Sequence, residues 1–144
     1  MALNFNTKGY LYETITLTFE EFKHHFGTNP RRMGQINNAL PFFKIFHSCG
    51  CKAVYVDGSF VSKKTYPEDI DLCFDINNID AEKLEKEFPQ FFDVQEIGRI
   101  RGDLQCHIFH FDENNKRLLR ILEEDRDGDP KGLVKLNLKD IHLL

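Results

Sequence analysis

The sequence predicts an α/β (α+β) fold, in which a small mixed β-sheet has helices packed on it. Short runs of β-branched and aromatic residues alternate with amphipathic helical segments, which is typical of a sheet covered by helices. The length of 144 residues, with 41% hydrophobic and 29% charged side chains, fits a single domain over residues 1–144. Fourteen Phe residues and no Trp provide enough apolar volume for one packed core.

The helical N-terminal part, residues 18–49, is predicted to form two helices. The first begins at a capping box whose cap is Thr18 and ends at Gly27. The second has Asn29 as its cap and Pro30 at its first position. Apolar positions at three- and four-residue steps form one stripe along this second helix, made of Met33, Ile36, Leu40, Phe43 and His47.

The central part, residues 52–111, is predicted to carry most of the sheet. Runs of β-branched and aromatic residues predict strands at 52–56, 70–74 and 104–111. A helix capped by Asp80 is expected between the second and third of these strands, and Pro89 stops it.

The C-terminal part, residues 116–138, is predicted to contain a helix, a turn and a strand. The helix covers 116–124, the turn 125–132 and the strand 133–138. The acidic turn is similar to a calcium-binding loop, but its glycine is misplaced and the distal Glu is missing, which favours a structural turn.

The composition excludes several classes of protein. Nineteen Lys and Arg against 23 Asp and Glu give a net charge of −4, unlike a strongly basic nucleic-acid or anionic-lipid binder. Residues 1–21 lack the apolar core of a signal peptide, and no run of about 18 apolar residues predicts a membrane span. The four cysteines lack a zinc-binding spacing, which favours buried free thiols. We expect a cytoplasmic protein without a membrane partner.

Two carboxylates lie two residues apart on the second predicted strand. Asp69 and Asp71 point to the same face, about 7 Å apart along the chain at roughly 3.4 Å of rise per residue. Both therefore reach one or two Mg²⁺ or Mn²⁺ ions, hard cations that take oxygen ligands and leave coordination positions for substrate phosphates. The alternative interpretation is the solvated face of an edge strand, where charges protect against aggregation.

A Gly-Ser turn precedes this carboxylate pair. Gly58 and Ser59 have small side chains and free backbone N–H groups, and Lys63 or Lys64 adds a cation. Phosphate donors, metal-binding carboxylates and a cation are the parts that phosphoryl transfer from a nucleoside triphosphate requires. The alternative interpretation is a plain hairpin, since Asp57 followed by glycine is a strong turn signal.

Three segments together resemble a known family. Residues 26–32, 57–75 and 126–132 are similar to conserved segments of small, largely uncharacterised bacterial proteins with the nucleotidyltransferase fold of the DNA polymerase beta superfamily. The resemblance spans about 16–138 of the sequence. It implies transfer of a nucleoside monophosphate from a nucleoside triphosphate to a hydroxyl on a protein, RNA or small molecule, with Mg²⁺ or Mn²⁺ as cofactor and pyrophosphate as product.

The resemblance also assigns site residues. It implies that Gly58 and Ser59 hold the triphosphate, that Asp69 and Asp71 bind the metal ions, and that Lys64 faces the phosphates. The superfamily usually supplies a third carboxylate from a later strand, but the predicted strand 104–111 contains no acid. His107 takes this place and is a candidate general base near pH 7. Asp103 is the alternative if the register differs.

A second function stays open at the level of sequence. Without the third carboxylate, the chain is alternatively a degenerate nucleotide-binding or interaction module, such as part of a toxin–antitoxin or defence system with a partner protein. For Lys131 the sequence leaves two roles open, contact with the nucleotide and contact with an acceptor. Arg31 and Arg32 are expected to be solvated residues at the start of their helix, and the alternative is that they line the phosphate cleft.

Overall fold

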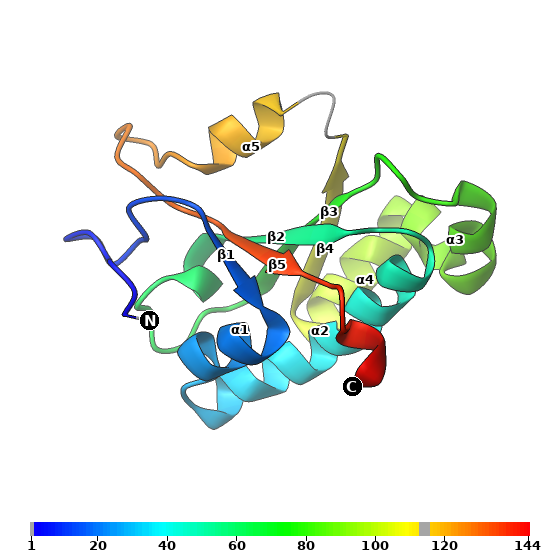
Figure 1. Cartoon of the computed structure of the whole chain (residues 1–144), viewed down its shortest axis with the longest axis horizontal. Helices are drawn as coiled ribbons and strands as arrows, with labels where there is room; N and C mark the ends of the chain where they lie inside the picture. Colours follow the sequence, from blue (N-terminus) through cyan, green and yellow to red (C-terminus); the bar gives the residue numbers. More distant parts are fainter. Residues whose placement is uncertain (1, 113–115) are drawn as a thin grey trace.

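The computed structural model describes residues 2–112 and 116–144, and its centre is a five-stranded mixed sheet (Figure 1). The strands are β1 (Ile15–Thr18), β2 (Ala53–Asp57), β3 (Ile70–Asp75), β4 (Cys106–Phe111) and β5 (Val134–Asn137). Their order in the sheet is β1-β5-β2-β3-β4. β1 runs parallel to β5 and β3 runs parallel to β4, while β2 is antiparallel to both of its neighbours. The predicted fold class is confirmed.

Five α-helices surround this sheet. They are α1 (Phe19–Phe26), α2 (Pro30–Ser48), α3 (Ala81–Glu87), α4 (Val94–Leu104) and α5 (Arg117–Leu122), and 3-10 turns form at Gly58–Val61, Pro89–Phe92 and Ile141–Leu143. The predicted caps are confirmed, because Thr18 forms a capping box and the Asn29 side chain accepts from the backbone of Arg32. Within the described ranges, none of these helices has both the length and the apolar content needed to cross a membrane.

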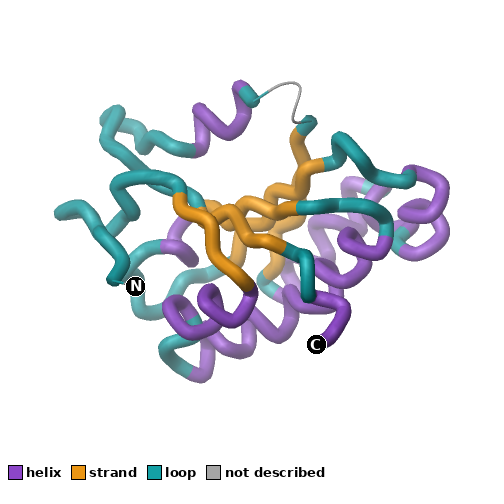
Figure 2. Tube along the Cα trace, viewed as in Figure 1, coloured by secondary structure: helices purple, strands orange, loops and turns teal. Residues whose placement is uncertain are grey.

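The sheet has a large core on one face and a small one on the other. The large core lies between the sheet and α1 and α2, and it contains most of the buried phenylalanines. Phe46 of α2 stacks on Phe74 of β3 with ring centroids 3.8 Å apart. On the opposite face, α5 covers the smaller cluster of Cys73, Phe111, Leu119 and Leu133. Figure 2 shows these helices on the two sides of the strands.

Three elements of the structure, β1, α4 and β4, differ from the prediction. β1 directly precedes α1 and was not predicted. The predicted strand 104–111 begins too early, since Leu104 ends α4 and Gln105 turns the chain with a positive φ of 59°. The helix α4, which the side chain of Asp93 caps, was not predicted. It contains two glycines, and glycine is a weak helix former, so its sequence gives little helical signal.

The two alternative interpretations, a plain hairpin at Asp57 and an edge strand with Asp69 and Asp71, are both wrong. The chain leaves β2 through a 3-10 turn and a loop, and β3 begins only at Ile70, so Asp57 and Gly58 do not form a tight hairpin. β3 lies between β2 and β4, so its carboxylates are not on an edge strand. All four cysteines are buried and free, as expected.

Candidate functional site

Three polar side chains form a row across the sheet on the face that carries α5. Asp57 of β2 lies directly opposite Asp71 of β3, and Asp71 is in register with His107 of β4. Residues in register on neighbouring strands point to the same face. Nδ1 of His107 lies 3.1 Å from Oδ1 of Asp71, which fixes the orientation of the imidazole ring. The row therefore contains two carboxylates and one potential general base.

Gly58 makes a close approach to this row possible. It follows Asp57 with a φ of 77°, which favours glycine, and a Cβ at this position would lie only 2.5 Å from Oδ2 of Asp71. Ser59 continues the chain into the 3-10 turn. The predicted phosphate turn and one predicted metal ligand, Asp71, are thus in direct contact.

The environment of Asp57 disfavours its negative charge. The residue is only 6% exposed, and Oδ1 has no hydrogen-bond partner among the described residues. Nζ of Lys131 lies 3.7 Å from this oxygen. Burial raises the pKa of Asp57, while the charge of Lys131 opposes that rise. Burial likewise raises the pKa of Asp71, and His107 opposes it. The carboxylates of Asp57 and Asp71 are hard oxygen donors, and Oδ1 of Asp57 is buried without a hydrogen bond from the described residues, so this pair fits a divalent cation.

Asp69 lies outside this row and forms an ion pair with Arg101. Nε and Nη2 of Arg101, from α4, both lie 3.0 Å from its Oδ2. Asp103 also lies in α4, where it is exposed, so it does not take the place of a carboxylate on β4. The arginine partner was not foreseen because α4 itself was not predicted.

The two predicted phosphate lysines lie on the exposed loop that follows the 3-10 turn. Nζ of Lys63 is 5.9 Å from the centre of the Phe5 ring, and the Lys63 amide donates to the carbonyl of Gly9. Lys63 and Lys64 line a pocket together with Phe5 and Asn29. Lys63 thus contacts the N-terminal segment, and the carbonyl of Lys64 accepts from Arg32 of α2. Among the described residues, neither lysine contacts Asp71.

Arg32 is buried, and the expectation that it is solvated is wrong. It is 3% exposed, and its guanidinium group donates to four backbone carbonyls, those of Phe26, Phe60, Ser62 and Lys64. The guanidinium also lies 4.8 Å from the centre of the Phe60 ring. Because three of the four acceptors belong to residues 60–64, Arg32 holds the loop after Gly58 and Ser59 in place. Arg31 is exposed, as expected.

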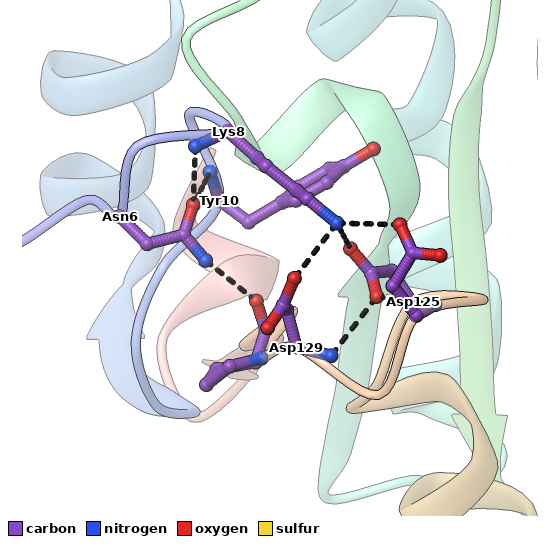
Figure 3. A network of polar contacts seen from close by, with 7 residues as sticks. Asn6, Lys8, Tyr10, Asp125 and Asp129 are labelled. Atoms are coloured by element: carbon purple, nitrogen blue, oxygen red, sulfur yellow. Dashed lines mark hydrogen bonds and ion pairs between the residues drawn. The ribbon is translucent and has the colours of Figure 1, made fainter.

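The acidic turn is closed by Lys8, from the N-terminal segment (Figure 3). Nζ of Lys8 lies 2.8, 2.9 and 2.8 Å from carboxylate oxygens of Asp125, Asp127 and Asp129. Hydrogen bonds to these carboxylates raise the pKa of Lys8 above its usual value. The turn is thus structural, as expected, and an ammonium group lies where a calcium-binding loop would hold its ion. It also carries Lys131, the partner of Asp57.

Gly58→Ala is expected to destabilise the protein more than Gly128→Ala. Both glycines have a positive φ, 77° and 79°, but nothing lies within 4 Å of a Cβ at Gly128. The backbone strain, about 1 kcal/mol, is therefore common to both, and displacement of Asp71 adds roughly 1–2 kcal/mol at Gly58. Urea unfolding of both variants measures the difference. Equal losses would contradict the close contact between Gly58 and Asp71.

Two site residues, Asp57 and Lys131, were not assigned to the site from the sequence. Asp57 was placed with Gly58 and Ser59 beside the predicted cleft but was given no role there, although its alternation with Tyr55 places it on the face of the strand that carries polar groups. Lys131 was left open between two roles, because its distance from Asp57 depends on how the acidic turn folds back. Neither contact has a local sequence signal.

Comparison with known proteins identifies the family. Residues 3–137 match a family of unknown function, DUF6932. Searches of curated proteins and of solved structures found no significant match. Since the matched region covers nearly the whole sequence, the chain belongs to DUF6932, a family of unknown function.

Proposed function

We propose that this protein transfers a nucleoside monophosphate from a nucleoside triphosphate to a hydroxyl group on a protein, RNA or small molecule. The observation that carries this proposal is the contact between the Gly58 turn and the carboxylate of Asp71. It brings backbone N–H donors for phosphates beside an oxygen ligand for a metal ion. We also propose that the reaction takes place in the cytoplasm, as the sequence suggests.

The proposed roles follow from the chemistry of each group. Asp69 and Asp71 hold Mg²⁺ or Mn²⁺, which neutralises charge on the phosphates, and Gly58 and Ser59 bind the triphosphate. The acceptor oxygen forms a bond to the α-phosphorus, the bond from this phosphorus to the bridging oxygen breaks, and pyrophosphate leaves. With Nδ1 directed at Asp71, Nε2 of His107 accepts the proton of the acceptor hydroxyl.

The two lysines keep their proposed role as additional phosphate contacts. Lys63 and Lys64 are exposed, and the loop that carries them follows the Gly58 turn directly. Their long side chains are free to reorient when an anionic ligand arrives, because their charged groups are compact and rotatable.

A second candidate function is nucleotide binding without transfer, as in the regulatory part of a toxin–antitoxin or defence system with a partner protein. The contact between Arg101 and Asp69 favours it. An arginine at 3.0 Å neutralises one of the two proposed metal ligands, and the row on the sheet ends in His107 instead of a third carboxylate from β4.

A labelling experiment distinguishes these functions. The protein is incubated with Mg²⁺ and each α-labelled nucleoside triphosphate in a bacterial lysate, and labelled protein, RNA and pyrophosphate are separated. We expect label on one acceptor class together with release of pyrophosphate. Calorimetric titration that shows triphosphate binding without any transfer would support the second function instead. Absence of both binding and transfer would contradict both functions.

A further inference from the structure

Asp57 and Asp71 repel each other when both carboxylates are ionised and no cation lies near them. The two residues are directly opposite on antiparallel strands, and like charges in such positions destabilise a sheet. Asp57 is almost fully buried, and the side chain of Asp71 is only 24% exposed. Water therefore screens their repulsion less than on an open surface.

Lys131 compensates this charge incompletely. Its Nζ lies 3.7 Å from Oδ1 of Asp57, which is too long for a good hydrogen bond, and this oxygen has no other partner among the described residues. Buried carboxylate oxygens are nearly always hydrogen-bonded or bound to a metal ion. On the other side of the row, Oδ1 of Asp71 contacts His107. The unsatisfied oxygen thus lies on the side of the row nearest Lys131.

We propose that Asp57 and Asp71 together hold a divalent cation, and that the ammonium group of Lys131 takes the place of that cation until it binds. Asp57 then supplies, from β2, the additional carboxylate that β4 lacks. Two carboxylates on neighbouring strands suit Mg²⁺ or Mn²⁺, which use few protein ligands and keep the remaining positions for water and phosphate oxygens.

This inference deepens the proposed function and rests on it for the identity of the ion, but it is tested without nucleotide. Mn²⁺ is titrated into the full chain at low ionic strength, and free Mn²⁺ is followed by electron paramagnetic resonance. Asp57→Asn is expected to weaken binding about tenfold or more. Lys131→Met is expected to strengthen it about fivefold, because the competing cation is removed.

Three variants serve as matched controls. Asp75→Asn removes a carboxylate from the same face of β3, Lys135→Met removes a lysine from β5, and Asp127→Asn removes one carboxylate of the exposed turn. Each is expected to leave the affinity for Mn²⁺ within about twofold of the unmodified protein. An Asp127→Asn variant that abolishes binding would place the ion at the acidic turn and overturn the proposal.

The remaining outcomes separate this inference from the proposed function. If Asp57→Asn binds Mn²⁺ as tightly as the unmodified chain, the role of Asp57 is wrong, whatever the labelling experiment shows. If the unmodified chain binds no Mn²⁺ at millimolar concentration, the site itself is wrong. If Asp57→Asn unfolds, Lys131→Met still decides, since unchanged or weaker binding in this variant contradicts the competition between lysine and metal ion.

Discussion

Substitution of two of the three proposed metal ligands, Asp69→Asn and Asp71→Asn, is expected to lower the rate of nucleotidyl transfer by about 1000-fold or more. A neutral amide binds Mg²⁺ more weakly than a carboxylate, so the charge that develops on the phosphates loses its stabilisation. A 1000-fold loss corresponds to about 4 kcal/mol of transition-state stabilisation. Initial rates of pyrophosphate release from the preferred nucleoside triphosphate measure the effect.

Asp75→Asn is the matched control for this substitution. Asp75 lies on the same strand and the same face as Asp71, but four residues further along and outside the row with His107. We expect its rate to stay within about twofold of the unmodified protein. Circular dichroism shows whether the double variant keeps its fold. An undiminished rate in a folded double variant would eliminate the proposed mechanism.

Arg32→Met is expected to lower the free energy of unfolding by about 4 kcal/mol. The guanidinium group satisfies four backbone carbonyls, and it lies against the ring of Phe60. Methionine fills a similar volume but donates no hydrogen bond, so buried carbonyl oxygens lose their partners. Urea unfolding at neutral pH measures the loss.

Arg31→Met provides the comparison for Arg32. Arg31 is the exposed neighbour on the same helical turn, and it contacts one carbonyl, that of Pro67, at 3.3 Å. Its substitution is expected to change the free energy of unfolding by less than about 1 kcal/mol. Losses of similar size in both variants would show that the burial of Arg32 contributes nothing specific.

Local sequence signals were sufficient for most of the elements. The capping residues Thr18 and Asn29 marked the beginnings of α1 and α2, because a side chain that bonds to a nearby backbone amide acts over only three residues. Alternation and β-branched residues likewise marked β2, β3 and β5. The strand β1 is only four residues long, and α4 contains two glycines, so neither had a strong local pattern.

The candidate site was predictable only in part. Gly58 and Asp71 were predicted to share a site because they belong to one short sequence motif, and the structure brings these two residues together. The partners of Asp69 and Arg32 were not predictable, because Arg101 and the carbonyls of the loop at 60–64 lie about 30 residues away in the chain. Such contacts depend on how α4 and α2 pack, which no local spacing specifies.

The amino-acid sequence alone was enough to establish the α/β class, most helix boundaries and the acidic motif of β3, since these depend on residues within a few positions of one another. The row of Asp57, Asp71 and His107 has a different origin. It exists because β2, β3 and β4 pair in one particular register, and a shift of one residue would turn each side chain to the other face. The burial of Asp57 beside Lys131 likewise arises only when the acidic turn packs against the sheet.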